Sequence, residues 1–407
     1  MVKKAQSRIS PVWWLSVAIL VLVVTVLYGI VLFNQVYLRP YDYPTHISWA
    51  RQLFQGDFEF HPGGVKIGAA YRPNFLFQAL VSGIMSLTGS DAQLSGMAVG
   101  LLANLILALS LHALFYMDFA RSERVISGFV AVALAVIVLL LGPVSFLTWH
   151  RANLYLGYIA PTVYHNPTLT LLRPLALLQF LCLVKGFDDV STGRQPLLVL
   201  VTALLTVVSV YAKPSYIICL LPAAGLAMVV QWLRKQPVDW LFIGAGIIVP
   251  GFVVLILQYQ FTYIANTDNN VIFAPLLAAR TMESVHILPK LILSFVFPAA
   301  VSILYWPRVA RSHAFVLAWL VAFVALAYAY LLAESGMVGD GNFLWGAQVS
   351  LFILMVVALR FFVQQIIASG QPRISLRNGL LVGALLLHLI PGIVWYYAEA
   401  LTLEHWW

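Results

Sequence analysis

The segment from Arg39 to His46, which reads RPYDYPTH, places a guanidinium, a carboxylate and an imidazole within eight residues. Asp42 and His46 are four positions apart, so a helix would set them one turn from each other. A carboxylate beside a histidine is suited to take a proton from an acceptor hydroxyl. The alternative is that Asp42 only caps a following helix, because Asp is a favoured capping residue and Pro44 suits a first helical turn. The two roles are compatible, and the residues alone leave the choice open.

The elements that must position this segment are membrane helices. The chain has 407 residues, of which 62% are hydrophobic and 9% are charged, whereas soluble domains carry roughly 25% charged residues. Its apolar runs are long and continuous, unlike the short alternating strands of a transmembrane β-barrel. We therefore expect an all-α integral membrane protein. The net charge of +8 then reflects basic cytoplasmic loops, and we expect no nucleic-acid partner.

We expect about eleven transmembrane helices in a single domain spanning residues 1–407. They are predicted near residues 12–34, 93–117, 125–148, 168–186, 196–212, 215–233, 240–262, 289–306, 314–333, 346–367 and 378–398. The segment 74–89 is short for a span, and counting it as one would move most basic residues to the outside. We therefore expect a cytoplasmic N-terminus, an external C-terminus and a first external loop over residues 35–92 that carries surface or re-entrant helices.

One of these surface helices should follow Asp42 directly. Ile47, Ala50, Leu53 and Phe54 recur at helical spacing, and Gly56 is a suitable end. An amphipathic helix of this kind is expected to lie along the membrane surface.

The polar residues outside the predicted spans gather on the external side, in loops that are long enough to be functional. The candidates for substrate or phosphate binding there are Arg51, Lys66, Arg72, Arg151, His165, Asn166, Arg173, Lys213, Arg280, Glu334 and Asp340. Asp42 and His46 are the candidates for catalysis. We therefore expect the reaction of this protein to take place on the external side of the membrane.

Several of these candidates have a structural alternative. Arg173 falls roughly one and a half turns inside a span, where it either meets a phosphate, an acid or a cavity, or extends to the interface. Lys213 either binds a phosphate or marks the end of a helical hairpin. Asn166 or Thr168 could cap the helix that follows.

Two later loops carry further candidates. If residues 278–290 are helical, Arg280 and Glu283 share a face, either at a substrate or on a solvated surface helix. Glu334, at the end of a span, needs a partner, for which Arg173, Arg280 and Lys213 are candidates.

The layout of the chain resembles the GT-C superfamily, the multi-pass glycosyltransferases that use polyprenyl-phosphate-linked sugars. The resemblance lies in a first helix followed by a long external loop that opens with an acidic residue, Asp42, and a surface helix. It implies that Asp42 activates the acceptor, and that an arginine of a later external loop, such as Arg280, contacts the donor phosphate. The paired acids of several branches are absent, so the resemblance does not require a divalent metal, although the reaction class allows one.

The expected function is therefore transfer of a sugar from a polyprenyl-phosphate donor to a glycan, lipid or protein acceptor. The bacterial inner membrane is the expected location, with the active site on the periplasmic side. A transporter or flippase is the first alternative, and it predicts ionisable residues at mid-membrane and broken helices. A polysaccharide polymerase or ligase of another fold is the second. The chain has no ATP-binding loop, zinc-protease helix or nucleophile elbow.

Overall fold

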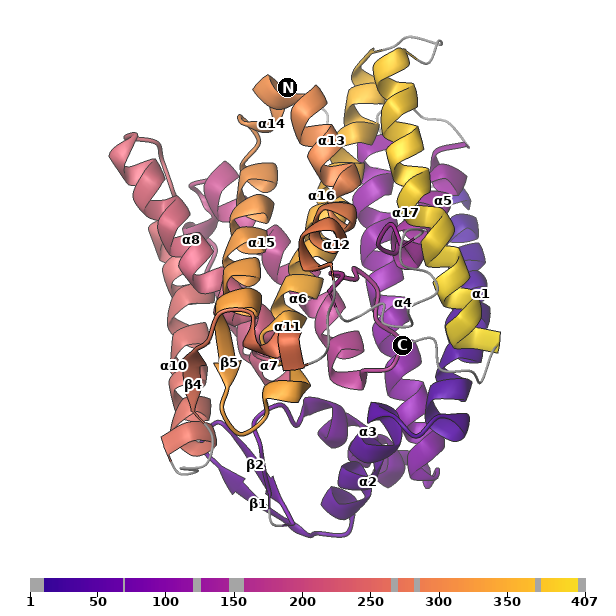
Figure 1. The fold of residues 1–407 in the computed structure, drawn as a ribbon, viewed down its shortest axis with the longest axis vertical. Helices are drawn as coiled ribbons and strands as arrows, with labels where there is room; N and C mark the ends of the chain where they lie inside the picture. Colours follow the sequence, from indigo (N-terminus) through magenta and orange to yellow (C-terminus); the bar gives the residue numbers. More distant parts are fainter. Residues whose placement is uncertain are drawn as a thin grey trace, which may run out of the picture.

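A computed structural model of the protein describes residues 11–68, 70–119, 126–145, 157–264, 270–281, 286–369 and 375–401. Figure 1 shows a bundle of long helices. Its α-helices are α1 (Pro11–Phe33), α2 (Asp42–Phe54), α3 (Leu76–Thr88), α4 (Ala92–Phe119), α5 (Ile126–Leu140), α6 (Pro167–Asp188), α7 (Pro196–Ala212), α8 (Ser215–Leu233), α9 (Trp240–Ile243), α10 (Val249–Tyr259), α11 (Leu277–Thr281), α12 (Ile287–Ser294), α13 (Val296–Leu304), α14 (Trp306–Val309), α15 (His313–Leu331), α16 (Leu344–Ser369) and α17 (Leu376–Leu401).

The remaining elements are short. They are the strands β1 (Phe58–His61), β2 (Gly64–Ile67), β3 (Ala70–Arg72), β4 (Val271–Phe273) and β5 (Leu332–Glu334), the π-helical turns η1 (Asn34–Leu38), η5 (Gly244–Ile248) and η6 (Gln260–Ile264), and the 3₁₀ turns η4 (Thr192–Arg194) and η7 (Val338–Asp340). The π-turns η5 and η6 continue α9 and α10 into one long helix from Trp240 to Ile264.

The expectation of an all-α membrane protein is confirmed. Within the described residues, eight helices are long and apolar enough to cross a membrane, and a ninth span is counted if the pair α12 and α13 forms one. The apolar helices α3, α5 and α7 are shorter. The count of about eleven spans stays a prediction, because it requires some of these shorter helices to cross.

The segment predicted as one helix over 289–306 is bent. Between α12 and α13 the axis turns by 60° at Phe295, whose ψ of 10° departs from helical geometry. The last residue of α12 is engaged by another part of the chain, since the Ser294 hydroxyl accepts a hydrogen bond from the backbone N–H of Ile159 at 2.9 Å. Sequence periodicity cannot detect such a break, because both halves are equally apolar.

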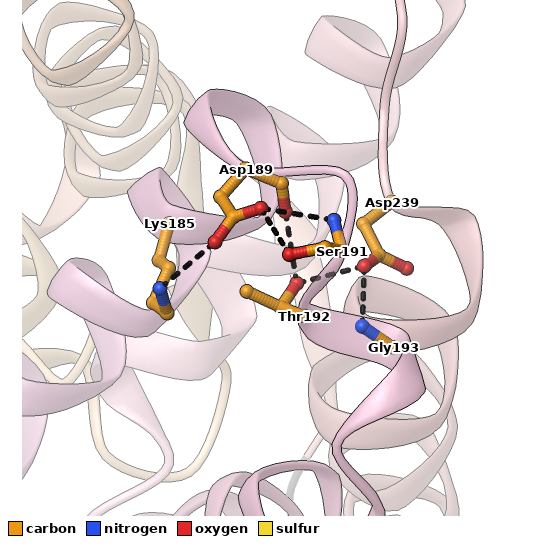
Figure 2. Close-up of polar contacts among 6 residues, drawn as sticks. All are labelled: Lys185, Asp189, Ser191, Thr192, Gly193 and Asp239. Carbon is orange, nitrogen blue, oxygen red and sulfur yellow. Dashed lines mark hydrogen bonds and ion pairs between the residues drawn. The ribbon is translucent and has the colours of Figure 1, made fainter. Parts of the chain in front are cut away.

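Polar contacts join the helices at one end of the bundle. Asp188 of α6 meets His313 of α15 at 2.8 Å, and Asp118 of α4 pairs with Arg360 of α16 at 2.8 Å. Figure 2 shows Asp189, in the loop between α6 and α7, and Asp239, at the start of α9, accepting hydrogen bonds from residues of that loop. These residues come from, or lie next to, the loops predicted to be cytoplasmic.

The elements of the first loop pack at the opposite end, where Figure 1 shows α2, α3 and the small sheet together. The predicted surface helix forms as α2, with Ile47, Ala50 and Leu53 buried as expected, whereas Phe54 is 47% exposed. Strands β1, β2 and β3 form an antiparallel sheet in the order β1-β2-β3. The sequence analysis did not predict this sheet. Its Val65 packs with Leu53 of α2 in a small separate core.

Polar groups also tie the interior together. Gln179 of α6 donates to the Thr206 hydroxyl of α7 at 3.1 Å, and the Ser209 hydroxyl donates to the Gln179 carbonyl oxygen at 3.3 Å. Hydrogen bonds of this kind hold helices together where lipid offers no hydrophobic driving force. They fix α6, which is the most enclosed of the long helices and whose first turn carries the site described next.

Candidate functional site

Asp42 and Asn166 form the centre of the site, although 124 residues separate them in the chain. The Asn166 amide nitrogen donates to the Asp42 carboxylate at 2.6 Å. The other end of the same amide caps α6, because its oxygen accepts from the Leu169 N–H at 2.9 Å. The capping bond therefore fixes which way the amide points. Of the two residues predicted as possible caps, Asn166 is the one that caps the helix, and in addition it holds the candidate base.

Asp42 itself sits in the first turn of α2. The residue that caps this helix is Tyr41, and it makes no side-chain capping bond. A carboxylate in the first turn is still favoured by the helix dipole. Its described hydrogen bond goes to Asn166 and not to the backbone of α2, so capping alone does not account for its position.

Lys213, in the turn between α7 and α8, is the third residue of this site. Its ammonium group donates to the Thr168 hydroxyl at 3.2 Å, and that hydroxyl donates to the Asn166 amide oxygen at 2.8 Å. The ammonium also lies 5.1 Å from the centroid of the Trp345 ring, at the start of α16. Lys213 is only 8% exposed, so its charge is held inside the site and does not extend to water.

Burial and charge act in opposite directions on these two groups. Burial raises the pKa of Asp42 above its ordinary value, while Lys213 and the Asn166 hydrogen bond oppose that rise. Burial lowers the pKa of Lys213 to about 8, against the attraction of Asp42, Asp340 and Glu334. A carboxylate with a raised pKa is a stronger proton acceptor than an ordinary aspartate, and the neighbouring charge of Lys213 favours its ionised form.

Glu334 and Asp340 add negative charge on the far side of Lys213. Glu334, in β5, is 7% exposed and accepts hydrogen bonds from the Tyr263 hydroxyl and the Asn342 amide. Asp340 lies exposed in η7. Lys213, one of the three partners predicted for Glu334, interacts with it electrostatically.

The two histidines of this region are neutral. The pKa of His46 is lowered to about 3, first by burial and then by Lys213 and Arg72. The pKa of His165 is also lowered to about 3, by burial and by the charges of Lys213 and Arg39. Neither ring therefore carries a positive charge for a phosphate at neutral pH.

His46 lies one turn from Asp42 in α2, but its partners are on α3 and in α2 itself. Its Nδ1 is 2.8 Å from the Gln78 amide nitrogen, and because an amide NH₂ only donates, Nδ1 accepts and the ring proton is on Nε2. The ring packs edge-on against Trp49, with centroids 4.8 Å apart. These contacts make His46 part of the packing between α2 and α3.

Arg173 lies inside the bundle and does not extend to the interface. It is seven residues beyond Asn166, about 10 Å along α6, and is 2% exposed. Its guanidinium lies 4.7 Å from the centroid of the Phe352 ring of α16 and hydrogen-bonds with the Tyr28 hydroxyl of α1. Of the two predicted alternatives, the structure favours an enclosed position over snorkelling.

The remaining cations of the first loop lie farther from Asp42. Arg51 is exposed and donates to the Gln93 amide oxygen at 3.1 Å. Lys66 is exposed on β2, opposite Glu59 of β1. Arg72 of β3 stacks on Trp49, with its guanidinium carbon 3.6 Å from the ring centroid.

The other predicted residues of the external loops lie away from this centre or outside the described residues. Arg39 does not face Asp42 but forms a buried ion pair with Glu399 of α17 at 2.8 Å. Arg280 is exposed at the end of α11, and a continuous helix over 278–290 is not formed, because His286 adopts a left-handed φ of 56° immediately before α12. Arg151 and Glu283 lie outside the described residues.

The sequence analysis missed Gln348, which lies on α16 one turn below Trp345. A single glutamine inside a long apolar helix was the available signal, because polar residues at such depth are rare and have partners or functions. It also missed Tyr263, whose contact with Glu334 depends on the position of α10.

Within the described residues, no group of three or more His, Cys, Asp or Glu side chains is placed to hold a metal ion. Comparison with models of known protein families finds no match to this chain. Comparison with curated proteins finds none either.

Proposed function

We propose that this protein is an outward-facing membrane glycosyltransferase that moves a sugar from a polyprenyl-phosphate donor to an acceptor hydroxyl. The observation that supports this most directly is the Asp42 carboxylate. It has a raised pKa, is held by Asn166 at 2.6 Å, and is joined through Asn166 and Thr168 to Lys213. The position of Asp42 at the start of the first loop also fits the resemblance to the GT-C superfamily.

In this reaction the acceptor oxygen attacks the anomeric carbon of the donor sugar. The new carbon–oxygen bond forms as the bond from that carbon to the phosphate oxygen breaks, and the lipid phosphate leaves with the electron pair. The acceptor proton passes to the Asp42 carboxylate. Direct displacement inverts the configuration at the anomeric carbon. Asn166 keeps the carboxylate in place, and Lys213 favours its ionised form before the proton arrives.

The leaving phosphate needs positive charge near the bond that breaks. Lys213 is a poor candidate for this role, because its ammonium group already interacts electrostatically with Asp42, Glu334 and Asp340. Among the first-loop cations, Arg72 has an oriented guanidinium, because it stacks on Trp49. The acceptor, whether a glycan, a lipid or a protein, would reach Asp42 from the external side.

Transport of a lipid-linked or anionic substrate is the second candidate. Two observations favour it, namely the 60° break between α12 and α13 and the enclosed Arg173, because broken helices and buried charges are common at transport sites. Transport does not by itself require a proton acceptor, whereas sugar transfer to a hydroxyl does.

The test is the surface-glycan composition of a deletion strain complemented with wild type, Asp42→Asn or Asp57→Asn at matched membrane levels. Asn at position 42 can still accept the Asn166 hydrogen bond but cannot take a proton, so we expect a loss of transfer of about 10²–10⁴-fold. Asp57 is an exposed acid of the same loop, and its variant should restore the sugar fully. Full restoration by Asp42→Asn would refute Asp42 as the base.

A further inference from the structure

Arg173 and Gln348 are two enclosed polar side chains whose hydrogen bonds are incomplete. Arg173 is 2% exposed and Gln348 is 1% exposed. Within the described residues, the Nε and Nη2 atoms of Arg173 and both amide atoms of Gln348 have no hydrogen-bond partner. Buried polar groups are almost always paired, so four such atoms on two side chains call for an explanation.

Arg173 is on α6 and Gln348 is on α16. α16 packs against α6, with Phe352 under the Arg173 guanidinium and Trp345 beside the Lys213 ammonium. Gln348 is three residues after Trp345 and four before Phe352, so all three share one face of α16. Gln348 therefore lies between the level of Lys213 and that of Arg173, which are about 10 Å apart along the helix.

The unpaired atoms of Arg173 have a specific geometry. Nε and Nη2 form one edge of the guanidinium, and their N–H bonds point in parallel, which matches two oxygens of a phosphate or carboxylate. No carboxylate of the described residues forms an ion pair with Arg173 at 4 Å or less, whereas Lys213 interacts with three acids. Among the described residues, the deeper cation is thus the one without an ion-pair partner.

Gln348 carries a donor and an acceptor one helical turn from Phe352, the residue that lies against the Arg173 guanidinium. Gln179, by contrast, lies on α6 in the same bundle and uses both of its amide atoms, in bonds to Thr206 and Ser209. The protein can therefore satisfy a buried glutamine from its own side chains, and at Gln348 it does not.

We propose that Arg173 and Gln348 form an inner binding site for a phosphate ester. Two phosphate oxygens would accept from Nε and Nη2 of Arg173, and a third would accept from the Gln348 amide nitrogen. The Gln348 oxygen would accept from a hydroxyl beside the phosphate. The binding site stands on these two residues alone; its assignment to the lipid-phosphate group of a sugar donor rests on the proposed function.

The first test needs no ligand and compares thermal unfolding of Gln348→Met and Gln179→Met with wild type in the same detergent. Methionine at 348 replaces two unpaired polar atoms, so its Tm should equal or exceed that of wild type. Methionine at 179 breaks two hydrogen bonds, so its Tm should fall by a few degrees. A fall at 348 as large as that at 179 would show that Gln348 is paired within the protein and would overturn the proposal.

The second test measures ligand-induced stabilisation with three probes, namely polyprenyl monophosphate, the polyprenol without phosphate, and inorganic phosphate. We expect the phosphate-bearing probes to raise the Tm and the polyprenol to have no effect. Stabilisation by the lipid phosphate alone identifies a lipid headgroup as the ligand. Equal stabilisation by inorganic phosphate identifies free phosphate. If neither phosphate raises the Tm, the site does not exist.

Substitutions test whether Arg173 and Gln348 are the residues that bind the phosphate. Arg173→Met should weaken phosphate binding at least a hundredfold, and Gln348→Met about tenfold, as expected for one hydrogen bond to a charged group. Unchanged binding in Arg173→Met would overturn the proposal. Asp42→Asn separates this inference from the proposed function, because it should bind phosphate like wild type while it transfers no sugar. If it binds phosphate and still transfers sugar, the inner site stands and Asp42 is not the base.

Discussion

The contact between Asn166 and Asp42 makes a prediction about the pH dependence of the site. Asn166→Ala removes the charge-assisted hydrogen bond that favours the ionised carboxylate. Such a bond contributes about 1.5–3 kcal/mol, and one pKa unit corresponds to about 1.36 kcal/mol. Removing it should therefore raise the pKa of Asp42 further, by about one to two units. The acidic limb of the activity profile should move to higher pH by the same amount.

The alkaline limb should depend on Lys213. The pKa of Lys213 is lowered to about 8, so the ammonium is present below pH 8 and is lost above it. The wild-type profile should then fall above about pH 8, because the uncharged amine no longer anchors the hydrogen-bonded chain through Thr168 and Asn166 that holds Asp42. In Lys213→Arg the side chain stays charged in this range, and the alkaline fall should disappear.

The assay follows the Asp42 carboxyl directly by infrared difference spectroscopy in membranes, with Asp42→Asn identifying the band. Once a donor is known, initial rates over the same pH range report the two limbs. Asn166→Ala also removes the cap of α6, which costs about 1 kcal/mol of stability. Ser312→Ala is the matched control, because Ser312 caps α15 beside the Asp188–His313 contact at the other end of the bundle. It should lower the Tm without moving either limb.

The reasoning is refuted if Asn166→Ala and Ser312→Ala lower the Tm alike and leave the Asp42 titration where it is in wild type. Asn166 would then be a helix cap only, and the hydrogen bond to Asp42 would have no role in its ionisation.

Two further predictions concern stability and are checked by thermal unfolding in one detergent. Arg39→Met leaves the Glu399 carboxylate buried without its ion-pair partner and should cost about 3–5 kcal/mol, whereas the double variant with Glu399→Met should recover most of that loss. Gly392→Ala would place a methyl group 1.8 Å from the backbone oxygen of Leu140, so α5 and α17 must separate and the folded yield should collapse. Gly383→Ala is its control on the same helix, because nothing lies within 4 Å, and it should leave the Tm unchanged or raise it.

Local features of the site could be predicted from the sequence. The apolar runs specify helices because only helices and closed barrels satisfy backbone groups in lipid. The spacing of Ile47, Ala50 and Leu53 specifies the buried face of α2, and the polar residues before an apolar run narrow the cap of α6 to Asn166 or Thr168. These predictions depend on neighbours in the chain, where propensity and capping act.

The pairing of distant residues could not be predicted in this way. Asp42 and Asn166 meet only because α2 folds back onto the first turn of α6, and Lys213 arrives from a third segment. Residues that are close in sequence need not pair either. Arg39 is three residues from Asp42 in sequence, and yet it pairs with Glu399 of the last helix.

What the sequence alone determined is therefore the class of molecule, its long helices, the helix that begins at Asp42 and a polar cap of α6 at Asn166 or Thr168. The tertiary structure alone decided that Lys213 is compensated by three acids while Arg173 and Gln348 keep unpaired atoms inside the bundle. The physical reason is that charge compensation and burial depend on distances between segments far apart in the chain. Those distances are fixed by the packing of α6 against α16, which no local pattern specifies.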